Sequence, residues 1–165
     1  MWDQGSRIED RKCRSEERKG CMAITHYKDL GVWQKSMDLA VEIFKVAKWL
    51  PKEELYGLSD QMRRAVVSVP SNIAEGQQRS STRDYIRFLH IAKGSLGELE
   101  TQIMLCERLE YLGKDKTDQL IKQCIEIQRM ISGLINSLMS VLNKENLERK
   151  KACENENNRS KGMAV

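Results

Sequence analysis

The chain has 165 residues, of which 32% are charged and only 5% aromatic, with two prolines and a formal net charge of +4. One domain fits that length, and the composition favours long helices over a β-sandwich. No apolar run approaches the roughly 20 residues that span a bilayer, and residues 1–21 lack the apolar centre of a signal peptide, so we expect a cytoplasmic protein without a membrane segment.

The two ends of the chain are highly charged and have little apolar periodicity. Residues 1–21 contain six basic and five acidic side chains, and residues 144–165 contain six and four. Such compositions are typical of disorder, so we expect disordered segments at 1–26 and 144–165 around a folded domain at 27–143. Sixteen basic and fifteen acidic residues are left for 22–143, which is nearly neutral. Met22 would make a plausible start, which leaves open whether residues 1–21 belong to the native protein.

The first two predicted helices are both limited or interrupted by proline. The first spans residues 30–50, and Pro51 ends it because the residue before a proline is disfavoured in the helical region. The second spans 59–77 and carries Pro70 in its interior. A proline there removes a backbone hydrogen bond and costs about 3 kcal/mol, so we expect a kink. Short polar side chains nearby can satisfy the freed carbonyls: Ser68, Ser71 and Asn72.

The third and fourth predicted helices form a hairpin. The third spans 82–112, with Ser81 and Asp84 at the spacing of a capping box and Gly113 as a left-handed stop. The fourth follows Asp115 and reaches about Asn143. Only residues 113–115 separate the two, so they must fold back on each other. The sequence therefore predicts an all-α, antiparallel, up-and-down four-helix bundle with a Pro-kinked second helix.

The first and fourth helices carry more apolar side chains than one bundle face requires. The first helix has one stripe of Trp33, Met37, Val41 and Phe44 beside another of Leu39, Ile43, Val46 and Leu50. One stripe can face the core, and the other needs a neighbouring helix or another subunit. We expect a homo-oligomer, with coverage by helices of the same chain as the alternative.

Two glycines interrupt the third predicted helix. Gly94 and Gly97 each cost about 1 kcal/mol relative to alanine in a helix interior. We expect them to form a narrow waist against which another helix packs closely. A ligand that contacts exposed backbone is the alternative.

Signatures of catalysis or metal binding fail specific tests. The five cysteines are an odd number without a C-x-x-C pair, and we expect Cys106 and Cys124 to be small apolar core residues. A di-iron bundle needs Glu-x-x-His on two helices, and neither histidine of this chain has a glutamate three residues before it. We therefore predict no enzyme, no cofactor and no catalytic or metal-binding residues.

Basic residues gather along the second helix and at the start of the third. Residues 57–97 contain six basic and three acidic side chains, and the balance reverses to three against six in 98–118. Arg83 and Arg87 lie near a helix N-terminus, where the dipole disfavours cations by tenths of a kcal/mol. With Arg79 they form the best candidate anion or nucleic-acid site, joined by Arg63 and Arg64 if the kink brings that pair to the same end. The alternative is a subunit interface in which these arginines meet acidic residues.

Three strings in this sequence together resemble a family of small bacterial four-helix bundle proteins named after the intervening sequences of 23S ribosomal RNA. They are LGVWQKSMDLAVEI at 30–43, YGLSDQMRRAVVSVPSNIAEG at 56–76 and KGSLGELETQIMLCERLEYL at 93–112. The resemblance covers about residues 27–142 and implies an antiparallel bundle, often a ring of five, without established catalytic activity. A distant relative, the accessory protein of diversity-generating retroelements, uses a similar pentamer to bind nucleic acid beside a reverse transcriptase.

The resemblance and the arginines together favour one function over another. We expect a non-catalytic, oligomeric protein, a pentamer by that resemblance, that binds RNA or DNA. A structural or adaptor module that binds a protein partner is the alternative. The sequence does not name the partner or distinguish RNA from DNA.

Overall fold

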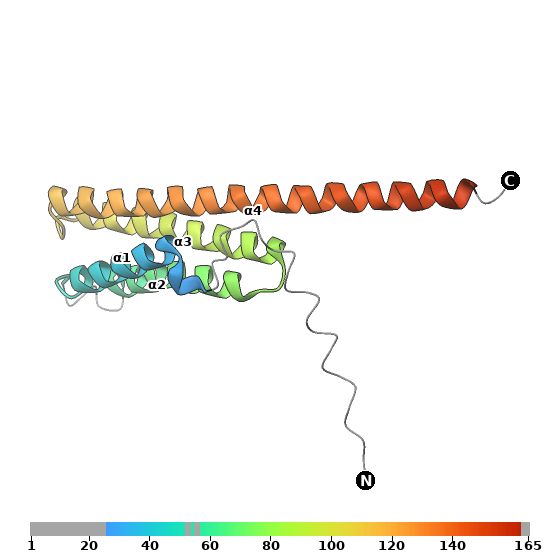
Figure 1. Cartoon of the computed structure of the whole chain (residues 1–165). Helices are drawn as coiled ribbons and strands as arrows, with labels where there is room; N and C mark the ends of the chain where they lie inside the picture. Colours follow the sequence, from blue (N-terminus) through green and yellow to red (C-terminus); the bar gives the residue numbers. More distant parts are fainter. Residues whose placement is uncertain (1–25, 52–53, 55–56, 163–165) are drawn as a thin grey trace, which may run out of the picture.

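The computed structural model describes residues 26–162, apart from 52–53 and 55–56 (Figure 1). A short 3-10 turn, η2 (Tyr27–Asp29), precedes four helices: α1 (Gly31–Ala47), α2 (Leu58–Gln78), α3 (Thr82–Arg108) and α4 (Lys114–Gly162). The predicted all-α class and the antiparallel arrangement of four helices are confirmed. The predicted disordered segment at 1–26 lies outside the described residues except for His26.

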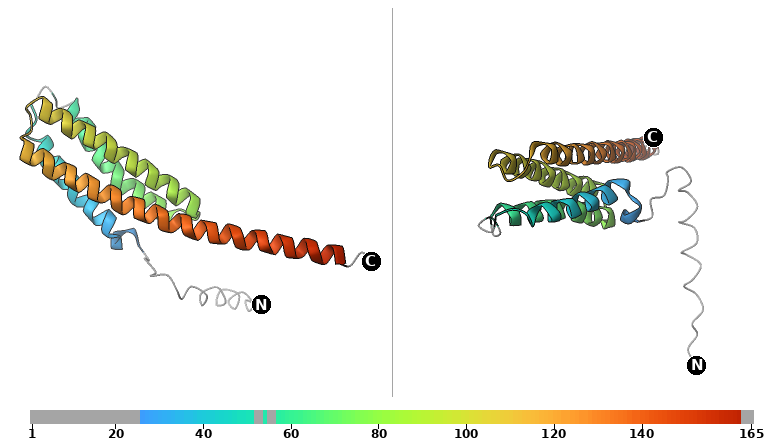
Figure 2. Two further views of the ribbon diagram at one scale, coloured as in Figure 1. Left: turned by 90° about the horizontal axis from the view of Figure 1, so that it is seen from above. Right: turned by 90° about the vertical axis from the view of Figure 1, so that its left-hand side faces the viewer.

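The helices pack in chain order around one apolar core. The most extensive contact joins α2 to α3, α1 packs on α2, α4 packs on α3, and a smaller contact between α1 and α4 completes the bundle (Figure 2). Each helix contributes fully buried side chains to this core, among them Ile43, Met62, Val66, Leu89, Leu96, Ile103, Leu120 and Ile127. Of the two stripes predicted on α1, the one with Leu39, Ile43 and Val46 faces the core.

The second helix runs through Pro70, which is buried, without a break in its helical structure. The Ser71 hydroxyl donates to the Val67 carbonyl at 2.8 Å, and the Asn72 amide donates to the Ser68 carbonyl at 2.7 Å. The carbonyl that loses its backbone donor at Pro70 is that of Val66, and these two bonds go to the next two carbonyls along the chain. That the short polar side chains satisfy the freed carbonyl therefore stays a prediction. The Ser68 hydroxyl accepts from Asn72 and from Ser95 of α3 instead. The size of the kink stays a prediction.

The end of α3 differs from the prediction. The helix stops at Arg108, and the left-handed residue after it is Glu110, with φ of 61°. The expectation that Gly113 takes this conformation is wrong, and no described glycine has a positive φ. The chain turns early because Tyr111 and Leu112 fold back against the core, with the Tyr111 amide donating to the Cys106 carbonyl at 2.9 Å.

The fourth helix does not end near Asn143, because it continues to Gly162. Residues 144–162 are therefore helical where the sequence predicted disorder. Extending an existing helix adds a hydrogen bond per residue without a new nucleation cost, and this segment is rich in Lys, Glu and Arg, which favour helices. The extension projects past the connection between α2 and α3 (Figure 1). None of the described helices is long and apolar enough to cross a membrane.

Candidate functional site

The arginine end of the bundle is formed by the connection between α2 and α3. Arg79 is the C-terminal cap residue of α2, and the Ser81 hydroxyl caps α3 by accepting from the Asp84 amide at 3.3 Å. This half of the predicted capping box is confirmed. The Arg79 guanidinium pairs with Glu75 and lies 5.0 Å from the centre of the Phe88 ring. Arg79 is thus held in place by its own helix and by α3.

The next two arginines, Arg83 and Arg87, differ from Arg79 in having no ion-pair partner among the described residues. Arg83 and Arg87 lie in the first two turns of α3, and both are exposed. Neither forms an ion pair within 4.0 Å with any described residue, whereas Arg79 does. The structure therefore brings Arg79, Arg83 and Arg87 to one end of the bundle and leaves two of the three without a carboxylate partner inside the described part of the chain.

Arg63 and Arg64 lie toward the opposite end of α2. Sixteen residues separate Arg63 from Arg79, which is about 24 Å along a helix. Arg64 pairs with Asp60 at 3.1 Å, and the Arg63 guanidinium donates to the Ala47 carbonyl at 3.4 Å. Arg63 and Arg64 were expected to join the arginine end only if the kink at Pro70 brought them there. Because α2 is one continuous helix through Pro70, they stay at its other end.

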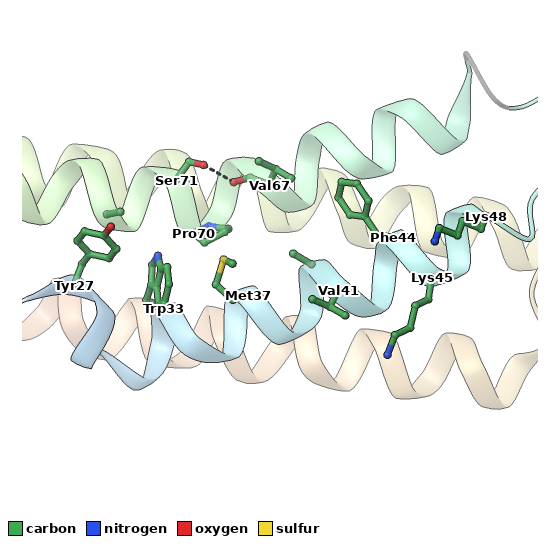
Figure 3. Close-up of a pocket in the computed structure, with 12 residues that line it drawn as sticks. Tyr27, Trp33, Met37, Val41, Phe44, Lys45, Lys48, Val67, Pro70 and Ser71 are labelled. Carbon is green, nitrogen blue, oxygen red and sulfur yellow. Dashed lines mark hydrogen bonds between the residues drawn. The ribbon is translucent and has the colours of Figure 1, made fainter.

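An apolar groove of about 650 Å³ runs between α1 and α2 (Figure 3). It is lined by the predicted stripe of α1 that does not face the core, which consists of Trp33, Met37, Val41 and Phe44. Of these residues, Met37 is 40%, Val41 52% and Phe44 41% exposed. Val67, 43% exposed, and Pro70 form the wall on α2. No helix of the described chain covers Met37, Val41 and Phe44 of this stripe, whereas Trp33 is partly buried against the core. The α2 wall was missed in the sequence, although Val67, Pro70 and Ala74 are spaced at helical intervals.

The two glycines of α3 also lack a close neighbour among the described residues. A methyl group built on Gly94 or Gly97 would have no atom within 4 Å, and Gly94 is exposed. The helix expected to pack on this waist is therefore not one of the described helices. Gly76 of α2 is the glycine at which two helices do approach closely, since a methyl group there would lie 2.8 Å from the Cβ of Phe88.

The buried thiols of Cys106 and Cys124 stay protonated at neutral pH, and a protonated thiol is a poor nucleophile and a poor metal ligand. Burial raises the pKa of the Cys106 thiol to about 11 and that of Cys124 to about 12. Both side chains lie in the apolar core, as predicted, and the Cys106 thiol contacts the Met62 sulfur at 3.6 Å. Over the described residues, no three His, Cys, Asp or Glu side chains come together as a metal site would require.

The fold and its surfaces define a class, an antiparallel four-helix bundle with an exposed arginine end and an open apolar groove. Comparison with protein families matches residues 28–133 to the 23S rRNA-intervening sequence protein family. The chain belongs to this family. The relation to the accessory protein of retroelements stays a prediction.

A solved structure supports the same assignment. It is the crystal structure of a protein of unknown function from the S23 ribosomal protein family of Bacteroides thetaiotaomicron, 30% identical to this chain with a TM-score of 0.60. The match covers 64% of this chain and 95% of the other. No curated protein matches the sequence.

Proposed function

We propose that this protein is a non-catalytic, homo-oligomeric bundle whose arginine end binds nucleic acid. The observation that carries the proposal is the exposure of Arg83 and Arg87 without a carboxylate partner among the described residues. Their position in the first turns of α3 is electrostatically unfavourable for the free protein. A phosphate would relieve that cost, because it contacts the guanidinium groups and the helix N-terminus together.

Self-association strengthens such a site. A ring or any closed oligomer repeats the arginine end once per subunit, so weak phosphate contacts act together on one long ligand. The groove between α1 and α2 is the surface we assign to subunit contact. Fully burying a side chain such as Met37 or Phe44 contributes about 1.5–3 kcal/mol, and these are already partly buried, so several must act together. The pentamer implied by the family resemblance is one such assembly.

A salt titration tests the arginine site. Arg79→Gln, Arg83→Gln and Arg87→Gln together should weaken binding of a labelled RNA or DNA oligonucleotide and flatten its salt dependence, by about 0.7–0.9 in slope for each phosphate that an arginine no longer neutralises. Arg63→Gln with Arg64→Gln is the control, because this pair lies at the other end of α2. Circular dichroism should show unchanged helix content in both variants. An unchanged affinity and slope in the triple variant would refute the site, and loss of the oligomer would place these arginines in an interface.

Light scattering tests the assembly. Wild-type protein at micromolar concentration should give a mass several times the 19.1 kDa of one chain. Val41→Glu should lower that mass because it places a charge in the groove. Leu147→Glu on the α4 extension is a matched control, since Val41 and Leu147 are 52% and 53% exposed. A wild-type monomer, or equal effects of the two substitutions, would contradict this role for the groove.

The open groove also favours a second function, an adaptor that holds an apolar segment of a protein partner. This candidate gains support if the wild-type chain is a monomer that does not bind oligonucleotides. A stable oligomer that covers the groove would exclude it.

A further inference from the structure

Four cations follow the outer face of α4 at helical intervals. Lys122 and Arg129 are seven residues apart, Lys144 and Lys151 are seven apart, and 22 residues separate the first members of the two pairs. Intervals of 7 and 22 residues are close to two and six whole helical turns, so the four side chains share one face of a straight helix. All four are exposed. The regular spacing is visible in the sequence, but it crosses the predicted boundary at Asn143, so the set was missed.

Several neutral hydrogen-bonding groups lie beside one of these cations, Arg129. A groove of about 450 Å³ between α3 and α4 is lined by Lys93, Arg129, Gln128, Ser132 and Asn136 among others. The Lys93 amine donates to the Ser132 hydroxyl at 3.1 Å across the two helices. A fifth cation is thus fixed beside Arg129 at the edge of the same face.

Three acidic residues near this face form no ion pair with its four cations, and one of them, Asp118, pairs with Lys114 instead. Glu126 lies one turn from both Lys122 and Arg129, but it pairs with Lys35 of α1. Glu148 lies four residues after Lys144 and three before Lys151, yet no ion pair within 4.0 Å joins it to either. Within the described part of the chain, the four cations are without a carboxylate partner.

We propose that Lys122, Arg129, Lys144 and Lys151, which we name the α4 track, bind the phosphodiester backbone of a nucleic acid. That the ligand is a nucleic acid rests on the proposed function. The surface itself is a different one, because the track does not include Arg79, Arg83 or Arg87. The distance along α4 from Lys122 to Lys151 is about 44 Å, which matches about 13 base pairs of duplex at 3.4 Å each. The α4 extension starts at the arginine end (Figure 1), so one long ligand can reach both surfaces.

The test uses the full chain and labelled duplexes of about 8 and 16 base pairs, which are shorter and longer than the track. Arg129→Gln with Lys144→Gln should leave two phosphates of the ligand without a cation. The fall in affinity between 50 and 200 mM salt should then shrink by about tenfold, and the advantage of the longer duplex should be reduced. The control is Arg64→Gln with Lys114→Gln, which removes the same two residue types. Both control cations are already ion-paired, with Asp60 and Asp118 respectively, so the salt dependence should stay at its wild-type value.

The outcomes separate the two proposals. If the track variant behaves as wild type while the triple arginine variant loses binding, the track is refuted and the arginine site stands. If the track variant loses salt dependence while the triple arginine variant keeps it, the track stands and the arginine site is refuted. If the wild-type chain binds neither duplex nor single strands at low salt, both are refuted.

Discussion

Replacing Gly76 by alanine should destabilise the bundle, although alanine is the better helix former. The substitution gains about 1 kcal/mol of helix propensity. The new methyl group, however, would lie 2.8 Å from the Phe88 Cβ and 2.8 Å from a ring carbon of Tyr85. The Phe88 Cβ is attached to the backbone of α3 and cannot rotate away, so α2 and α3 must separate. Overpacking costs about 1–3 kcal/mol, and we expect a net loss of about 1 kcal/mol.

Gly94→Ala is the matched control in the same bundle. No atom lies within 4 Å of the methyl group that it adds, so only the helix propensity changes, and we expect a gain of about 1 kcal/mol. The two variants should therefore differ by about 2 kcal/mol, which is about 4–8 °C in Tm for a chain of this size. Circular dichroism during urea unfolding, at the lowest usable concentration, measures the difference with little contribution from assembly.

The signs of the two changes decide whether the reasoning holds. If both substitutions stabilise, the close approach at Gly76 is not a real constraint. If Gly94→Ala destabilises only at concentrations where the protein is assembled, another subunit packs on the α3 waist, as the sequence predicted for another helix.

Three further predictions follow from single residues. Glu110→Gly should stabilise the protein by up to about 1 kcal/mol in thermal unfolding, because Glu110 holds a left-handed conformation that glycine adopts freely, and a loss would contradict that φ. Hydrogen bonds from Lys116 and Lys45 lower the pKa of Glu42 from 4.5 to about 2. The stabilisation of the fold by the ionised Glu42 should therefore be complete above pH 5 and disappear as the carboxylate is protonated toward pH 2. Glu42→Gln should therefore cost no more than about 1 kcal/mol at pH 7 and nothing near pH 2, measured by Tm against pH. Cys106 and Cys124 should resist a thiol reagent at pH 8 until the protein unfolds, since burial raises the pKa of both thiols. Rapid labelling of either of these two cysteines in the native protein, located by peptide mass spectrometry, would contradict this.

Helical periodicity was sufficient to predict the bundle but not its helix ends. Apolar residues at intervals of three and four predict two apolar stripes on α1, because burial follows the same period as the helix. They do not predict which of the two stripes faces the core. The end of α3 depends on the packing of Tyr111 and Leu112, a tertiary effect, so Glu110 takes the conformation expected of Gly113. The extent of α4 depends on continuing an established helix into a polar sequence, which composition alone reads as disorder.

The arginine end could be predicted from the sequence in part. Arg79, Arg83 and Arg87 are close along the chain, so their proximity needs only the short connection between two helices. Whether Arg63 and Arg64 join them depends on the path of α2 through Pro70, which the sequence left as a condition. The wall that Val67 contributes to the apolar groove requires the relative placement of α1 and α2, which no local pattern specifies.

Purification of the full chain at low salt tests the central claim, nucleic-acid binding, most directly. The ratio of absorbance at 260 and 280 nm is measured before and after treatment with RNase or DNase, and again after a high-salt wash. We expect bound nucleic acid that one nuclease removes and that high salt releases, because the contacts are to phosphates. A protein-only ratio at low salt, together with no shift of added RNA or DNA, would contradict the proposed function.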